Sequence, residues 1–216
     1  MRLNEKEALR YLGFRGRPAD PETVRAVREI GAALEKSLQP KCVSRRYAVR
    51  VSDTAVELDG WRIESVKLAR HLRGAEAAYL FAATLGPAPD RRQQKAEVQN
   101  MALALTLQAA AAAMIEAYCD EEAERLAAHF APKKLYLRPR FSPGYGDFPL
   151  SFQPVLLRAL DAPKRIGLTC TQSCLLAPTK SVTAVIGLSA APASAQTACA
   201  GKCASCENKT CPYRLS

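Results

Sequence analysis

Apolar residues in the first part of the chain recur with the period of helices. Asn4 precedes one such stretch, which predicts a short helix that Asn4 caps and that ends near Tyr11. The sequence Asp20-Pro21-Glu22 joins a capping aspartate to a proline suited to the first helical turn. It therefore predicts a second helix, which runs to about Leu38 and is closed by Pro40.

The next segments have the patterns of strands. Residues 42–51 alternate between apolar and polar side chains, and a turn at 52–54 is expected to return the chain into a second strand over 56–63. A short helix is predicted from Ser65 to Gly74. The run Ala77–Leu85 is apolar almost throughout, which is typical of a strand buried on both faces.

Long helical stretches and single strands fill the rest of the chain. The stretch from Asp90 to about Tyr118 contains no helix breaker and predicts the longest helix. Helices and strands do not alternate regularly, so the predicted fold class is α+β, with a mixed or antiparallel twisted sheet and long packed helices. The other expected elements are a helix over 120–130, a strand over 134–138, a helix over 151–160 capped by Ser151, and strands near 166–173 and 181–188.

The composition changes abruptly near residue 190. A chain of 216 residues can bury one substantial core, with room for a small appendage. The low-complexity stretch Ala190–Thr197 is typical of a linker. We therefore expect one domain over 1–190, a linker over 191–198 and a cysteine-rich tail over 199–216.

Charge and hydropathy argue against two classes of protein. The formal net charge is +10, but the basic residues are spread along helical patterns, and aromatic residues make up only 6% of the chain. Both features argue against a nucleic-acid-binding protein. The sequence has no run of eighteen apolar residues and no signal-peptide pattern, so we expect a cytoplasmic protein without a membrane partner.

Candidate chemistry is densest in the segment from Arg140 to Asp147. Pro143 sets a turn, while Gly144 and its neighbour Gly146 lack the Cβ atoms that would hold a ligand away from the backbone amides. The guanidinium of Arg140 suits a carboxylate, and Tyr145 supplies a ring face and a hydroxyl. The segment therefore predicts a site for a zwitterionic ligand, with an ordinary solvent-exposed turn as the alternative.

These residues also carry a family resemblance. The segment Arg140-Phe-Ser-Pro-Gly-Tyr145, with Thr84-Leu85-Gly86 and the run Pro178–Gly187, resembles the S-adenosylmethionine-binding activation domain of cobalamin-dependent methionine synthase, in its free-standing form. The resemblance implies the fold of that domain. It also implies a ligand site that includes Arg140, Ser142, Pro143, Gly144 and Tyr145. The acidic group that it implies is Glu121 or a neighbour at the start of the helix expected from Asp120.

The function implied by the resemblance is accessory. Such a domain offers S-adenosylmethionine to a partner methionine synthase that lacks its own activation domain and carries inactive cob(II)alamin. An electron donor such as a flavodoxin or ferredoxin reduces the cobalt, and the methyl group traps it as methylcobalamin. The sequence itself shows no general base or nucleophile, which suits a role of positioning within a methyltransferase system for methionine biosynthesis.

Four of the eight cysteines lie in the last eighteen residues, as Cys199, Cys203, Cys206 and Cys211. Clustered thiols in an intracellular chain favour a metal centre over disulfides, so we expect one Zn²⁺ or one iron–sulfur cluster there. Free thiols are the plainer alternative. A second functional hypothesis follows from the tail: a metal-stapled binding module without a role for S-adenosylmethionine, with nucleic acid among its candidate ligands.

One histidine repeats part of a cobalamin-binding pattern. His71 and Gly74 have the spacing of the family's Asp-x-His-x-x-Gly sequence, but Ala69 stands where the aspartate belongs. The segment has a helical pattern, so His71 is predicted to be a surface residue rather than a ligand.

Overall fold

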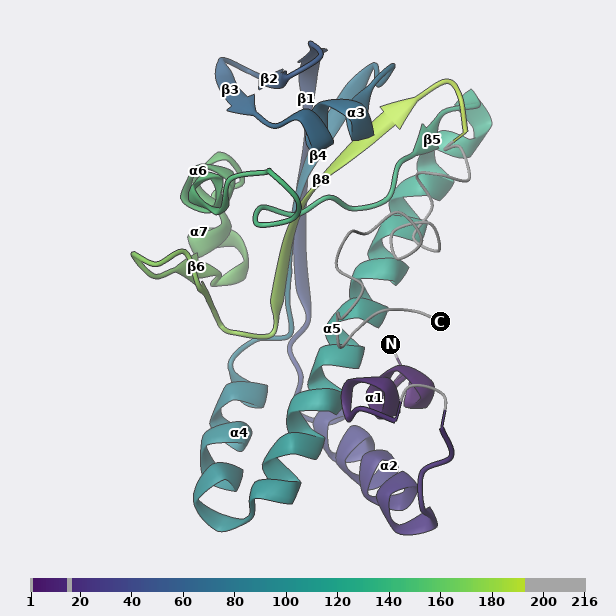
Figure 1. The fold of residues 1–216 in the computed structure, drawn as a ribbon, viewed down its shortest axis with the longest axis vertical. Coiled ribbons are helices and arrows are strands. Elements are labelled where there is room, and N and C mark those ends of the chain that lie inside the picture. The colour runs from purple at the N-terminus through teal and green to yellow at the C-terminus, as the bar shows by residue number, and fades with distance from the viewer. Residues whose placement is uncertain (1, 15–16, 193–216) are drawn as a thin grey trace.

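The computed structural model describes residues 2–14 and 17–192 (Figure 1). A six-stranded sheet runs through the described part of the chain, in the order β3-β2-β1-β4-β8-β5, and all its paired strands are antiparallel. The strands are β1 (Lys41–Val51), β2 (Ala55–Leu58), β3 (Trp61–Glu64), β4 (Ala77–Thr84), β5 (Tyr136–Leu137) and β8 (Ser181–Ser189), while β6 (Thr169–Cys170) and β7 (Leu176–Ala177) form a separate small hairpin.

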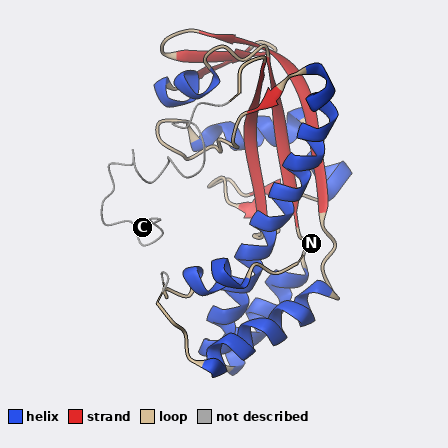
Figure 2. Cartoon of the chain, turned by 90° about the vertical axis from the view of Figure 1, so that its right-hand side faces the viewer, coloured by secondary structure: helices blue, strands red, loops and turns tan. Residues whose placement is uncertain are grey.

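Helices cover both faces of this sheet, so the predicted α+β class is confirmed (Figures 1 and 2). One face packs against α3 (Val66–Leu72), α6 (Gln153–Ala159) and α7 (Ala162–Ile166). The long helix α5 (Met101–Phe130) crosses the other face, and α1 (Glu5–Tyr11), α2 (Pro21–Glu35) and α4 (Ala88–Gln99) pack on α5. The fold therefore consists of two helical layers with an antiparallel sheet between them.

Strand β4 joins the two hydrophobic cores. Its eight residues are all buried, as the apolar run predicted. Because successive side chains of a strand point to opposite faces, Ala78, Leu80 and Ala82 pack toward α3, α6 and α7. Tyr79 and Phe81 pack on the side of α5.

Local capping sets the starts of three helices where the sequence predicts them. Asn4 accepts a hydrogen bond from the Glu7 amide at the start of α1, and Asp20 accepts one from the Thr23 amide at the start of α2. Ser65 caps α3 in the same manner. Each side chain satisfies an amide that has no partner inside its own helix.

Two predicted elements are divided in the structure. The strand expected over 56–63 is a hairpin of β2 and β3, since Asp59 and Gly60 both have positive φ and reverse the chain. The helix expected from Asp90 breaks at Asn100, which adopts extended backbone with φ −161° and ψ 113°. The Asn100 side chain then caps α5 by accepting from the amides of Ala102 and Leu103.

Helix α5 continues through residues 118–120, where the sequence predicted two separate helices. The helical segment Met101–Lys133 is long and apolar enough to cross a membrane by length and composition, with a hydropathy of 1.4 in its most apolar window. That window is 56% buried inside the fold, and the core helix of a globular domain passes the same test. In this structure α5 is the helix on which the second core is built.

The later elements are shorter than predicted. The strand expected over 134–138 is reduced to β5, and the one expected near 166–173 is reduced to β6 after α7 ends at Ile166. The predicted cap Ser151 lies within the 3₁₀ turn η2 (Leu150–Phe152) and makes no capping hydrogen bond to α6. The tail and most of the linker lie outside the described residues, so the proposed division of the chain stays a prediction.

The close approach of α3 to β8 generates the first prediction. A Cβ atom on Gly187 would lie 2.8 Å from Leu72 Cδ2 and 3.0 Å from Arg138 Cδ. We therefore expect Gly187→Ala to lower the free energy of unfolding by about 1 to 3 kcal/mol, measured by urea denaturation. Gly31→Ala is the comparison variant. Its Cβ would lie 2.5 Å from Leu3 Cδ2, but Leu3 is only partly buried and its side chain has room to shift, whereas Leu72 is fully buried. Alanine also favours a helix at position 31. Equal stability of wild type and Gly187→Ala would contradict this account.

Candidate functional site

The segment from Phe141 to Phe148 is attached to the sheet at its start. The amide of Phe141 donates to the carbonyl of Val185 at 3.0 Å, and the amide of Val185 donates back at 2.8 Å. Internal hydrogen bonds then shape the turns, including Gly144 N to Phe148 O at 2.9 Å. Gly144 and Gly146 have φ of +90° and +59°, a region that non-glycine residues rarely adopt. The predicted turn is therefore present and fixed to β8.

Both ends of helix α3 are bound by side chains from this part of the chain, Asp147 within the segment and Arg138 just before it. At its N-terminus, Asp147 accepts hydrogen bonds from the Ser65 hydroxyl and from the amides of Val66, at 2.8 Å, and Lys67, at 3.1 Å. Partial burial opposes the charge of Asp147, but these donors outweigh it and lower the pKa of the carboxyl. At the other end, Arg138 donates to the carbonyls of His71 and Arg73. The charges match the helix dipole at both ends.

His71 is a core contact of the site rather than the predicted surface residue. It is only 7% exposed, its Nε2 lies 2.8 Å from the carbonyl of Pro139, and its ring packs 5.1 Å from that of Phe141. The prediction was wrong because the helix around His71 turns toward β8 and the segment that follows β5.

Arg140 lies between the loop and α5. Its guanidinium donates to Glu116 at 2.7 Å and to Asp120 at 2.8 Å, and its side chain is 17% exposed. Desolvation opposes the charge, but Cys119 and the carboxylates of Glu116 and Asp120 together outweigh it, and the pKa of Arg140 is raised. The result is a cluster with one cation and two anions, open to solvent on the side of Asp120, whose side chain is 67% exposed. We call Arg140, Glu116 and Asp120 the charged cluster.

The other predicted site residues surround this cluster unevenly. Tyr145 is 62% exposed and projects from the turn, whereas Pro143 is buried and Ser142 is half-buried. Glu121 lies on α5 beside the cluster, with its carboxylate 4.0 Å from Arg125. The structure thus brings Arg140 together with Glu116 and Asp120. The carboxylate of Glu121 lies near a different arginine, Arg125.

Three acidic residues, Glu116, Asp120 and Asp147, were not singled out from the sequence. Glu116 and Asp120 are four residues apart, so they share one helix face and can hold one guanidinium between them. That spacing was the available signal. The capping role of Asp147 was harder to predict, because the helix that it caps lies 80 residues earlier in the chain.

The thiols of the described residues do not form a site. Burial raises the pKa of Cys42 to about 12 and also raises the pKa of Cys119, so both stay protonated near neutral pH. No cluster of three or more potential metal ligands occurs in the described residues. The predicted ligands Cys199, Cys203, Cys206 and Cys211 lie outside them.

Comparison with solved structures identifies the class of fold. The chain is similar to a crystal structure described as the MetH reactivation domain bound to AdoHcy, with a TM-score of 0.63 and 15% sequence identity. The match covers 87% of this chain and 77% of the other. No family model matches the sequence, and no curated protein matches it significantly. The predicted resemblance is therefore confirmed at the level of the fold.

The capping role of Asp147 generates the second prediction. We expect Asp147→Ala to lower the free energy of unfolding at pH 7 by about 0.5 to 2 kcal/mol. Because folding lowers the pKa of this carboxyl, its contribution is present above the unfolded-state value of about 3.9 and is lost as the pH falls through the folded-state value. The difference between wild type and variant should therefore shrink below about pH 4.

Urea denaturation across pH checks this prediction. Asp53→Ala is the control, since Asp53 is 92% exposed and has a single ion pair with Arg73. A stability loss for Asp147→Ala that does not change between pH 7 and pH 3 would rule out the ionised cap.

Proposed function

We propose that this protein binds S-adenosylmethionine and supports the reductive methylation of cob(II)alamin carried by a partner methionine synthase. The observation that carries the proposal is the charged cluster beside the glycine turn, on a fold similar to that of a reactivation domain solved with AdoHcy. The partner would lack an activation domain of its own. A flavodoxin or ferredoxin in the cytoplasm would supply the electron.

The residues of the cluster fit the charges of this ligand. S-adenosylmethionine carries a carboxylate, an ammonium and a sulfonium, so it needs one cation and more than one anion near its methionine end. Arg140 suits the carboxylate, and Glu116 and Asp120 suit the two positive groups. The exposed ring of Tyr145 and the open backbone at Gly144 would border the rest of the molecule. The same arrangement of charges favours S-adenosylmethionine over S-adenosylhomocysteine, whose sulfur carries no charge.

In this proposal the chain positions the ligand and does not react with it. S-adenosylmethionine supplies a methyl group when bound, and the partner supplies the cobalt. Asp147 and Arg138 fix the turn on α3, and the turn and α5 together orient the ligand for the approaching partner. A fixed turn matters because a methyl group held within reach of the cobalt has lost most of its freedom before the reaction.

The third prediction tests the role of Arg140. Isothermal titration calorimetry should show binding of S-adenosylmethionine to the full chain, and Arg140→Ala should weaken it by about ten- to a hundredfold through the loss of a charge-assisted pair. Tyr145→Phe should cost less if the ring matters more than the hydroxyl. Arg62→Ala is the matched control, because it removes a cation that also pairs with two carboxylates, those of Glu57 and Glu64, outside the cluster. Unchanged affinity of Arg140→Ala would exclude the proposed carboxylate contact.

The fourth prediction separates the acidic candidates. Glu116→Gln and Asp120→Asn should each weaken S-adenosylmethionine. The variant that removes the partner of the sulfonium should weaken it more than S-adenosylhomocysteine, because only the former has a sulfonium charge. Glu121→Gln tests the residue that the family resemblance implies. If only Glu121→Gln lowers the affinity, the acidic contact lies one position further along α5 and the charged cluster serves to orient Arg140.

The fifth prediction concerns the tail. We expect Cys199, Cys203, Cys206 and Cys211 to bind about one equivalent of metal, measured by elemental analysis and visible absorption after anaerobic purification. Zinc would indicate a structural staple, and an iron–sulfur cluster would indicate an electron relay. Less than about a tenth of an equivalent would defeat both versions.

Deleting residues 199–216 distinguishes the two functional hypotheses. The proposed ligand residues all precede residue 190, so the truncated chain should still bind S-adenosylmethionine. Loss of metal together with retained ligand binding is the expected result. A full chain that binds metal but not S-adenosylmethionine would instead favour the metal-stapled binding module.

A further inference from the structure

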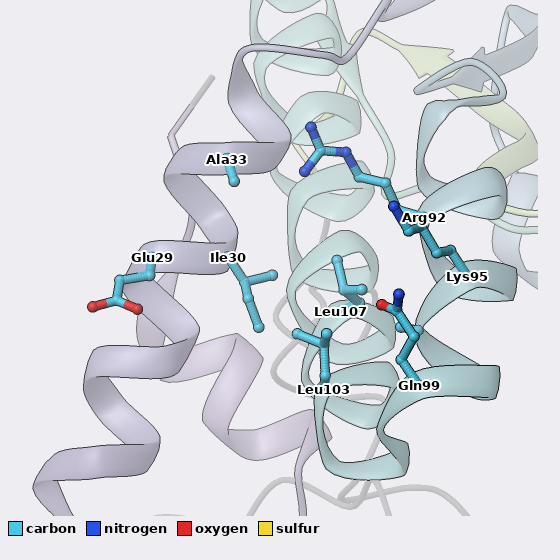
Figure 3. Close-up of a pocket in the computed structure, with 9 residues that line it drawn as sticks. Glu29, Ile30, Ala33, Arg92, Lys95, Gln99, Leu103 and Leu107 are labelled. Carbon is cyan, nitrogen blue, oxygen red and sulfur yellow. The ribbon is translucent and has the colours of Figure 1, made fainter.

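A groove opens between α2 and α4, at the end of the molecule where α5 begins (Figure 3). Both helices pack on α5, but they do not pack extensively on each other. The space that they leave has a volume of about 560 Å³. This is within the range of roughly 300 to 1,000 Å³ typical of small-molecule sites.

The interior of the groove is apolar. Leu103 and Leu107 of α5 form its floor, and Ile30 and Ala33 of α2 form one wall (Figure 3). Leu103 is 37% exposed, although its neighbour Leu107 is buried. A leucine left open in a concave site can bury more apolar surface when a ligand enters.

The other wall carries positive charge. Arg92, Lys95 and Gln99 are spaced three and four residues apart along α4, so they lie on one face of that helix. Neither Arg92 nor Lys95 has an ion pair or a side-chain hydrogen bond in the part of the chain that the structure describes. The only carboxylate among the lining residues is that of Glu29, which lies 4.0 Å from Arg25 and points away from the floor in Figure 3.

We propose that this groove is a second binding site, for a small amphipathic anion of the aliphatic carboxylate class. The chain of such a ligand would lie on Leu103, Leu107 and Ile30, and its carboxylate would meet Arg92 and Lys95. Charge on one wall and an apolar floor suit a molecule with a single anionic head. The volume of the groove suits an aliphatic chain of medium length.

The groove is separate from the charged cluster. Leu103 and Glu116 are thirteen positions apart on α5, which corresponds to about 20 Å along the helix. Arg92 and Lys95 belong to α4, which contributes nothing to the cluster. Binding at the groove can therefore be tested independently of S-adenosylmethionine.

Titration of the full chain with octanoate, decanoate and dodecanoate tests the proposal. Affinity should rise by about fourfold for each added methylene until the groove is filled, because each one buries the same apolar area. Dodecyltrimethylammonium has the same chain with a cationic head and should bind at least about tenfold more weakly than dodecanoate. Added salt should weaken dodecanoate, since both cations are exposed.

Two double variants identify the cations. Arg92→Gln with Lys95→Gln should weaken dodecanoate by about tenfold or more. Arg91→Gln with Arg158→Gln removes the same charge from positions that do not line the groove, and should change the affinity by less than about twofold. Leu103→Glu should also abolish binding, with circular dichroism as the check on folding.

Each outcome decides the proposal. Saturable binding with the expected order of variants supports it. Equal weakening by both double variants would show a response to net charge alone and would overturn it. No binding of dodecanoate up to about 1 mM to the wild-type chain would also overturn it.

Discussion

The contact of α3 with the segment after β5 is the constraint on which the candidate site depends. Asp147 occupies the N-terminal end of α3, Arg138 occupies the C-terminal end, and His71 between them meets the carbonyl of Pro139. A seven-residue helix is marginal alone, so the segment stabilises α3 as much as α3 fixes the segment. Because Gly187 lets α3 lie directly on β8, this unit is also joined to the sheet through a strand that pairs with β4.

The cores on the two faces of the sheet position different parts of the candidate site. The core beneath α3, α6 and α7 positions the glycine turn through Phe148 and Phe152. The core beneath α5 positions Glu116 and Asp120, because their helix crosses the opposite face. The charged cluster forms where the segment after β5 passes from one layer to the other. Its geometry therefore depends on the packing of both cores rather than on a single element.

Elements with a local cause were predictable from the sequence, and those with a distant cause were not. Asn4, Asp20 and Ser65 begin helices by accepting hydrogen bonds from amides three residues further along the chain. The turn at Gly144 is equally local, whereas the pairing of Arg140 with α5 depends on how distant elements pack. Gly60 and Asn100 are local signals for the two elements that the structure divides. The apolar or alanine-rich residues around them nevertheless favoured the prediction of continuous elements. The four cysteines of the tail are closely spaced, and a metal bound to them stays a prediction.

The charged cluster sets opposing requirements on any anionic ligand. Arg140 is mostly buried, so a charge without compensation there would be costly, and Glu116 and Asp120 supply that compensation in the structure described. A ligand carboxylate must share or displace one of these contacts, which lowers its net gain. A ligand that also carries positive charge recovers the loss, because the displaced carboxylate acquires a new partner. A ligand bound here would therefore be selected by the pattern of charges along it, and a simple carboxylate would be a poor occupant of the charged cluster.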